Sequence, residues 1–292
     1  MYENILVPLD GSNSDDAILP YARDLSKRIG SQITLISVLP PGSQQGKAQY
    51  KHLHQFYIQE ILKSSEKDNH NINSVISSGD PAEKIVDYSV KKGINLILMG
   101  THGRSSLKRW ILGSIADKVI SSSMVPVALL TTSEDKNESS LRRNLFRKSI
   151  VVLDGLQENE VVVPYAEELA SELKMGVTLL QVVGQAYEFY EGAEDYSSVP
   201  VSGRKMGAIK AKATKYLARV AGRLEDKGIK TRVEVAVGDS AETVIRIAGE
   251  HDADTVFMAT RGRSGLSRWF FGGVRGDIVN IGDVLIMLVR IP

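Results

Sequence analysis

The sequence contains no cysteine, and no apolar run in it approaches the length of a membrane span. The first absence excludes disulfide frameworks, thiolate metal sites and cysteine nucleophiles. The second argues against a membrane-spanning helix, which needs about 20 apolar residues in succession. An excess of charge is missing too, because 36 Lys and Arg are balanced by 35 Asp and Glu. A dedicated nucleic-acid binder needs surplus cations to neutralise phosphates, so no nucleic-acid partner is expected.

The composition is otherwise that of a globular protein, with 42% hydrophobic and 24% charged residues. The 292 residues are twice the length of an average domain of about 150 residues, which predicts two domains. The first apolar strand pattern begins at Ile5 and leaves no room for a signal peptide. These features predict a cytoplasmic protein.

Four blocks of the sequence occur twice in the same order, which indicates a duplicated domain. The first two blocks recur 144 residues later and the last two recur 159 residues later. The second copy therefore carries 15 more residues between its second and third blocks. The paired blocks are ILVPLDG at 5–11 and SIVVLDG at 149–155, ITLISV at 33–38 and VTLLQV at 177–182, GDPAE at 79–83 and GDSAE at 238–242, and MGTHGRS at 99–105 and MATRGRS at 258–264.

The first copy alternates short apolar runs with apolar residues at helical spacing. The expected strands are 5–9, 33–39, 73–77, 96–99 and 125–130, and the expected helices are 14–29, 48–66, 81–92 and 114–122. Asp80 is predicted to cap the third of these helices. Nearly continuous apolar strands separated by helices are typical of a parallel sheet covered on both faces. The fold class predicted is α/β, with two tandem doubly wound five-stranded parallel-sheet domains of Rossmann-like type.

The predicted domains are 1–132 and 146–292, joined by a polar linker at 133–145 that has no apolar period. The last strand of each copy, Val125–Leu130 and Val284–Val289, would be an exposed sheet edge if it stood alone. We expect these two strands to pair, which would join the copies as an intramolecular pseudo-dimer. A homodimer of whole chains is left open.

The segments that follow the strands carry the candidate binding residues, because ligands of doubly wound sheets bind beyond the carboxyl ends of the strands. Asp10 follows the first strand, where a carboxylate can accept hydrogen bonds from a ribose diol. The alternative is a helix cap or an Asp-Gly turn, and the residue type alone does not separate the two.

A glycine-rich segment follows the fourth strand, with Gly100, Gly103, Gly113 and Ser114 in the spacing G-x2-G-x9-GS. Glycines let phosphate oxygens approach the backbone closely. The N–H groups and dipole of a helix starting at Ser114 favour an anion. Glycine loops are often only turns, but this one joins a strand to a helix on the side where Asp10 emerges. The segment is therefore interpreted as a phosphate-binding loop.

Asp10, this glycine spacing and the final Val125-Pro126-Val127 strand together resemble the universal stress protein family, in two tandem copies over nearly the whole chain. The resemblance implies a parallel α/β sheet that binds ATP or another adenine nucleotide (AMP or ADP), usually with Mg²⁺. It implies that Asp10 and Gly100 hold the ribose. The residues implied to face adenine are Pro8, Leu9, Val38 and Met99. Those implied to surround the phosphates are Gly103, Arg104, Gly113, Ser114 and Ile115.

The second copy departs from this pattern. Ala259 stands at the position of Gly100, Gly273 at that of Ser114, and Leu156 at that of Ser12. A degenerate, structural copy is therefore expected, although several candidate site residues are kept. These are Asp154, Val182, Met258, Gly262 and Gly272.

The function expected is that of a nucleotide-binding protein acting in stress response or signalling through nucleotide-dependent conformation or partner binding. The alternatives are a nucleotide-independent stress interaction protein and a slow ATP hydrolase. No catalytic residue is assigned, because the loop lacks the Walker lysine and no base can be placed beside it. No side-chain cluster with metal-ligand spacing is found either.

Two conspicuous segments are interpreted as structural. His52 and His54 would face different sides of a helix, so they do not suggest a metal pair. The acidic, aromatic insert around 187–201 in the second copy is interpreted as a solvated loop, with a mobile flap or an interface as alternatives.

Overall fold

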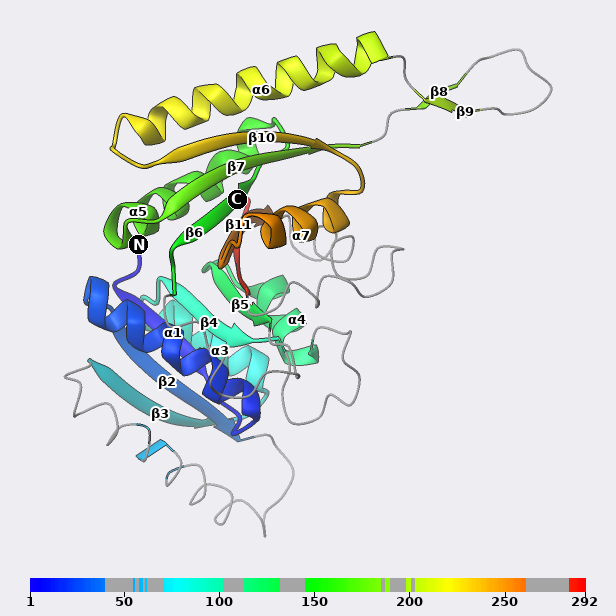
Figure 1. Ribbon diagram of the computed structural model, residues 1–292. Helices are drawn as coiled ribbons and strands as arrows, with labels where there is room; N and C mark the ends of the chain where they lie inside the picture. Colours follow the sequence, from blue (N-terminus) through cyan, green and yellow to red (C-terminus); the bar gives the residue numbers. More distant parts are fainter. Residues whose placement is uncertain are drawn as a thin grey trace. The chain divides into compact units, whose positions relative to one another are not determined.

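The computed structural model describes residues 1–39, 71–101, 113–131, 145–184, 203–260 and 284–292, together with positions 55, 58–59, 61, 187–189 and 198–200. These residues form two compact units, here called unit 1 (Met1–Phe146 with Thr260–Pro292) and unit 2 (Arg147–Ala259). Both units alternate strands with helices (Figure 1). The predicted α/β class with a mostly parallel sheet is confirmed.

Five parallel strands of the first sequence copy form the sheet of unit 1, in the order β5-β4-β1-β2-β3. They are β1 (Asn4–Pro8), β2 (Gln32–Leu39), β3 (Ile72–Ser78), β4 (Leu96–Gly100) and β5 (Val127–Thr131). The central strands are apolar on both faces, and the residues at 5–7 and 96–98 are 0% exposed. Such strands need helices on both sides of the sheet, which is the doubly wound arrangement predicted.

Three helices of unit 1 lie between these strands: α1 (Asn13–Ile29), α3 (Pro81–Lys91) and α4 (Ser114–Ser122). The cap predicted for α3 is confirmed, because the N–H of Glu83 donates to the Asp80 carboxylate at 3.1 Å. β5 begins two residues later than predicted. The reason is Pro126, which has no N–H to donate to the ladder and contributes only its carbonyl, to Ile97 at 3.0 Å. Most of the helix predicted at 48–66 lies outside the described residues.

The sixth strand of unit 1 is β12 (Val284–Arg290), which belongs to the second sequence copy. It pairs antiparallel with β5 from Leu288↔Val127 to Val284↔Thr131. The predicted pairing of the two final strands is confirmed by this register. It also explains why unit 1 contains the end of the chain. A two-fold arrangement of the copies stays a prediction.

The remaining strands of the second copy form unit 2, where the parallel order is β10-β7-β6-β11. They are β6 (Lys148–Val152), β7 (Gly176–Val183), β10 (Thr231–Val237) and β11 (Thr255–Thr260). The helices are a 3₁₀ turn η2 (Gln157–Val162), α5 (Val163–Leu173), α6 (Gly203–Glu225) and α7 (Ser240–Glu250). The order of the first four strands of the two copies is thus the same.

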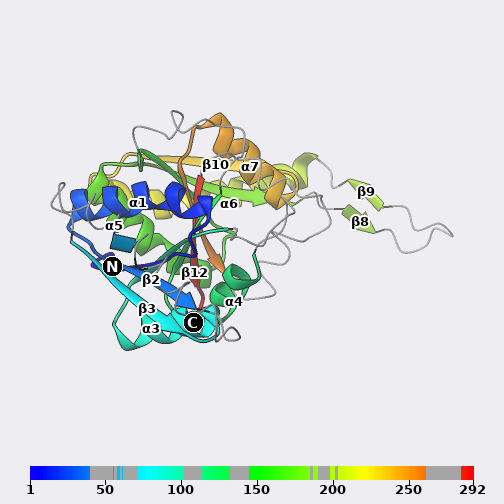
Figure 2. The ribbon, with the colours of Figure 1, turned by 90° about the horizontal axis from the view of Figure 1, so that it is seen from below.

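The insert of the second copy is more ordered than the loop predicted for it. Its two ends form β8 (Tyr187–Phe189) and β9 (Ser198–Pro200), which pair antiparallel as a separate two-stranded ribbon. Figure 2 shows this ribbon beyond one end of α6 and outside the main sheet. The residues between the two strands lie outside the described part of the chain.

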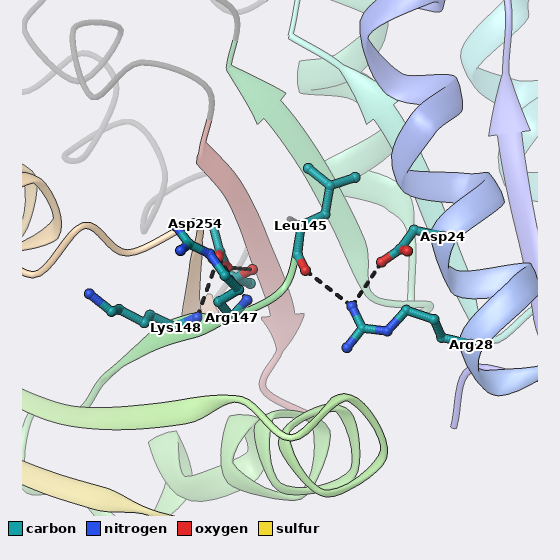
Figure 3. Close-up of polar contacts among 7 residues, drawn as sticks. Asp24, Arg28, Leu145, Arg147, Lys148 and Asp254 are labelled. Carbon is teal, nitrogen blue, oxygen red and sulfur yellow. Dashed lines mark hydrogen bonds and ion pairs between the residues drawn. The ribbon is translucent and has the colours of Figure 1, made fainter. Parts of the chain in front are cut away.

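In each copy, a side chain just before the fourth strand accepts hydrogen bonds from backbone N–H groups at the start of the first strand. In unit 1 the N–H of Asn4 donates to the Asn95 amide oxygen at 2.9 Å. In unit 2 the corresponding acceptor is Asp254, whose carboxylate receives the N–H of Arg147 at 2.7 Å and that of Lys148 at 3.3 Å (Figure 3). Asp254 is 0% exposed. Buried backbone N–H groups need such acceptors, so this contact sets where β6 begins.

The segment that precedes β6 is anchored in unit 1. Arg28 at the end of α1 donates to the carbonyl of Leu145 at 3.1 Å and to the Asp24 carboxylate at 3.0 Å (Figure 3). Next to it, Phe146 is 1% exposed and meets the ring of Tyr21 edge-on, with 5.7 Å between ring centroids. The predicted linker therefore ends on α1, although most of it lies outside the described residues.

We predict that Asp254→Ala lowers the free energy of unfolding of unit 2 by about 1–3 kcal/mol, because two partly buried N–H groups lose their acceptor. Asp252→Asn is the matched control. The Asp252 side chain is 54% exposed and forms a surface ion pair with Arg147, so its loss should cost less than about 1 kcal/mol. Urea unfolding of both variants measures the difference. Equal costs would contradict the role assigned to Asp254.

Candidate functional site

The sheet of unit 1 reverses its strand order at β1, which pairs with β2 on one side and with β4 on the other. In open α/β sheets, ligands bind beyond the carboxyl ends of the strands at such a reversal. Six predicted site residues lie at the carboxyl ends of these three strands, and the structure brings their positions together. They are Pro8 at the end of β1, Leu9 and Asp10 directly after it, Val38 on β2, and Met99 and Gly100 on β4.

The loop from β1 to α1 is held by a carboxylate that sequence reasoning missed. Asp15, in the first turn of α1, is 4% exposed. Its Oδ2 accepts the N–H of Asp10 at 3.1 Å and the N–H of Gly11 at 2.6 Å. The only signal in the sequence was the pair of acidic residues at the start of a helix, where carboxylates are generally favoured.

Within this loop Asp10 forms an Asx turn, because its Oδ1 accepts the N–H of Ser12 at 3.0 Å. The helix-cap alternative for Asp10 is wrong, since Ser12 is the N-cap residue of α1. Gly11 has φ = 76°, a left-handed conformation in which glycine is favoured. The Ser12 hydroxyl is buried and has no hydrogen-bond partner in the described part of the chain. A buried hydroxyl in that state is a donor available to a ligand.

Burial raises the pKa of Asp15 to about 7. The N–H groups of Gly11 and Asp10 lower it and the charge of Asp10 raises it further, but loss of solvation is the largest effect. The folded protein therefore binds more protons than the unfolded chain between about pH 4 and pH 7. In that window the free energy of unfolding falls as the pH rises, and above it the cost of the buried charge is constant.

We predict that Asp15→Asn stabilises the protein at high pH, because the amide oxygen accepts the same N–H groups without a charge. The advantage over the natural protein should be near zero at pH 4, grow up to pH 7 and level off. Its upper limit is about 4 kcal/mol, at about 1.4 kcal/mol for each pH unit between the two pKa values. Denaturant unfolding across this pH range measures it, with exposed Asp16→Asn as control. Parallel stability curves would contradict the prediction.

The start of α4 forms the other side of the candidate site. The loop at 102–112, with the predicted residues Gly103 and Arg104, lies outside the described residues. Its two ends meet, because the N–H of Gly113 donates to the carbonyl of Thr101 at 2.9 Å. Gly113 is the N-cap of α4, with φ = −58° and no side chain to cap the helix. Ser114 and Ile115 are exposed in its first turn.

The uncapped N-terminus of α4 thus lies directly beyond the end of β4. Its first-turn N–H groups have no capping side chain, and their partial positive charge favours an anion. The negative φ of Gly113 is open to any residue, so the backbone at this position does not require glycine.

The equivalent loop of unit 2 is arranged differently. Asp154 follows β6, and its Oδ1 accepts the N–H of Leu156 at 2.9 Å. Its Oδ2 accepts a hydrogen bond from the side-chain amide of Asn159, the residue at the position of Asp15. Gln181 donates to the Asp154 carbonyl at 3.0 Å. The predicted residues Val182 and Met258 lie on β7 and β11, whereas Gly262 and Gly272 lie outside the described residues.

A polar cluster on α6 also fixes this loop. Glu160 in η2 is 10% exposed and forms ion pairs with Arg219 and with Arg223, the latter at 2.8 Å. The Arg219 guanidinium stands over the Tyr216 ring at 5.3 Å. Burial raises the pKa of Tyr216 to about 12, and the charge of Glu160 adds to the effect. The sequence did not predict this cluster, because no pattern near residue 160 indicates that the arginines of α6 lie beside η2.

The fold defines a class of protein: two tandem doubly wound α/β copies, each with a reversal of strand order at its first strand. A sequence model of the Universal stress protein family matches residues 1–131 and 145–290. The chain therefore belongs to the universal stress protein family, as two tandem copies. No helix in the described residues has the length and apolar character needed to cross a membrane.

Individual relatives agree with the duplication. A universal stress protein of Methanocaldococcus jannaschii is 28% identical over 140 residues, which cover 44% of this chain and 82% of that protein. One from Methanothermobacter thermautotrophicus is 30% identical, covering 45% of this chain and 97% of its own length. The crystal structure of an Archaeoglobus fulgidus universal stress protein has a TM-score of 0.72 at 20% identity and covers 98% of this chain and 96% of its own. The last likeness bears on the fold alone.

Proposed function

We propose that unit 1 binds an adenine nucleotide and that the chain is a nucleotide-dependent stress or signalling module. The observation that carries the proposal is the pairing of β1 with β4. Because Asp10 follows β1 and α4 follows β4, this pairing puts the Asp10 loop and the start of α4 at the same end of the sheet. One group can hold a ribose and the other a phosphate, at the place where doubly wound sheets bind ligands.

The sugar end of the ligand is assigned to the β1–α1 loop. The Asp10 carboxylate accepts from ribose hydroxyls, and the buried, unpartnered Ser12 hydroxyl supplies a further hydrogen-bonding group. Leu9 and Met99 are 4% and 6% exposed and end neighbouring strands. Together with Val38 they offer an apolar surface for adenine. This set fits ATP, ADP and AMP equally, because all three share the same nucleoside.

The phosphates are assigned to the start of α4, where backbone N–H groups and the Ser114 hydroxyl donate. Gly103 and Arg104 are proposed to complete this part of the site. In the part of the chain that the structure describes, no group of three or more His, Asp or Glu side chains could hold a metal ion. Mg²⁺ would then bind mainly through the phosphate oxygens and water, as it does in many nucleotide sites. Its role would be to neutralise phosphate charge.

Unit 2 is assigned a structural or partner-binding role. Both carboxylate oxygens of Asp154 are engaged by its own loop, and the Glu160 ion pairs hold the following turn. Leu156, 49% exposed, replaces the hydroxyl that Ser12 provides in unit 1. Because the loop's own groups occupy the Asp154 carboxylate, we favour a nucleotide-independent role for the second copy, but not for the first. Hydrolysis by the first copy, if present, is expected to be slow because the Walker lysine is missing.

We predict one adenine nucleotide per chain when nucleotide-stripped protein is titrated with ATP in a calorimeter. Asp10→Ala should weaken binding by about 10–100-fold, the equivalent of about 1.5–3 kcal/mol for hydrogen bonds to a charged group. Asp154→Ala is the matched control and should bind as the natural protein does. Two equal sites, or none, would contradict the proposal.

We predict that Gly113→Val abolishes nucleotide binding without unfolding unit 1. Valine tolerates the extended backbone at this position, but its branched side chain would occupy the space beside the N–H groups of α4. Gly184→Val, at the end of β7 where an added Cβ meets nothing within 4 Å, controls for a general effect of valine. Circular dichroism checks the fold and calorimetry the binding. Unchanged affinity in folded Gly113→Val would exclude this helix start as the phosphate site.

A further inference from the structure

The fifth residue after the strand-end aspartate differs between the copies in the direction of its hydrogen bonds. In unit 1 this residue is Asp15, which accepts N–H groups from Asp10 and Gly11. In unit 2 it is Asn159, whose amide donates to the Asp154 carboxylate. Asp15 thus accepts hydrogen bonds from the backbone of its loop. Asn159 instead donates to the Asp154 side chain, which stands at the position assigned to the ribose in the first copy.

The chemistry of the two groups accounts for this difference. An ionised carboxylate has no proton to donate, so Asp15 in that state repels the Asp10 carboxylate instead of binding it. An amide NH₂ has two donors, and Asn159 uses one of them to hold Asp154. A protonated carboxyl resembles the amide, because it carries one O–H donor beside an acceptor oxygen.

We propose that the fifth residue after the strand-end aspartate gates that aspartate for ligand binding, and that a proton on Asp15 closes the first copy in the way that Asn159 closes the second. Asp15 is a positioning residue in this scheme. The ionised form supports the loop from the backbone side, whereas the protonated form donates to the Asp10 carboxylate and competes with the ribose. The identity of the ligand rests on the proposed function, whereas the hydrogen bond from protonated Asp15 to Asp10 does not.

The surroundings of Asp15 make the proton a realistic switch. The charged groups that act on it are Asp10 in the loop and Asp16 on α1, both of which favour its protonated form. α1 packs against β4 and β2, and neither strand carries a charged side chain. The cations of α1 in its described part, Arg23, Lys27 and Arg28, follow two or more turns later. With a pKa of about 7, Asp15 changes charge near neutrality.

The sign of the pH effect follows. A fall in pH from 8 to 6 protonates Asp15, engages the Asp10 carboxylate and weakens ligand binding. By linkage, a bound ribose that occupies Asp10 lowers the pKa of Asp15 by the same free energy.

The first test measures ATP affinity of the full, nucleotide-stripped chain at pH 6, 7 and 8. The natural protein should lose up to about 10-fold in affinity between pH 8 and 6, the limit for one proton with a pKa of about 7, in addition to the change that ATP's own phosphate ionisation causes. Asp15→Asn should bind at least about 10-fold more weakly at pH 8 and show only the dependence due to ATP. Asp16→Asn removes the same charge from an exposed neighbour and should keep the pH-dependent loss of affinity, with its midpoint at slightly lower pH because Asp16 no longer raises the pKa of Asp15. If the ATP affinity of Asp15→Asn changed with pH in the same way as that of the natural protein, the proposed role of Asp15 would be wrong.

The second test needs no nucleotide and separates the gate from the proposed function. In ¹³C-labelled free protein, the Asp10 carboxyl signal should shift with the midpoint at which Asp15 titrates, and the shift should vanish in Asp15→Asn. Asn159→Asp should give the Asp154 carboxyl a new titration with the same coupling. Loss of ATP binding at every pH with these shifts present would reject the nucleotide proposal and retain the gate. An Asp10 signal indifferent to Asp15 would reject the gate even if ATP binds.

Discussion

The pairing of β1 with β2 on one side and β4 on the other is the contact on which the candidate site depends. All three strands are parallel, so their carboxyl ends share one edge of the sheet. Ligands of doubly wound sheets bind beyond this edge, at the point where the strand order reverses. A strand-end carboxylate and a helix N-terminus can therefore serve one ligand, although more than 100 residues separate Asp10 from Ser114 along the chain.

Duplication has been followed by divergence in how each loop uses its polar groups. Both copies keep the aspartate and glycine after the first strand, with positive φ at Gly11 and Gly155. They also keep the acceptor that fixes the first strand, Asn95 in one copy and Asp254 in the other. The backbone scaffold is therefore shared. What differs is the fifth residue after the aspartate: Asp15 accepts backbone N–H groups of its loop, whereas Asn159 donates to the aspartate side chain.

Much of the fold follows from local pattern. Continuous apolar strands, the Asp80 cap and the repeat itself predicted the parallel α/β sheets and the start of α4 at Ser114, because such features depend on residues close in the chain. The strand-end positions of the candidate site followed from the same pattern, since they come directly after each strand. The β8–β9 ribbon was missed because its short strands pair only with each other, and a three-residue strand has little periodicity.

The sequence by itself determined the two copies, their alternation of strands and helices, and the residues at the strand ends. Tertiary structure alone decided which polar groups meet. The burial of Asp15, the hydrogen bond from Asn159 to Asp154 and the ion pairs between α6 and Glu160 depend on groups brought together by packing. The direction of a hydrogen bond and the pKa of a buried carboxyl follow from that local geometry and loss of water, and neither is encoded in residue spacing.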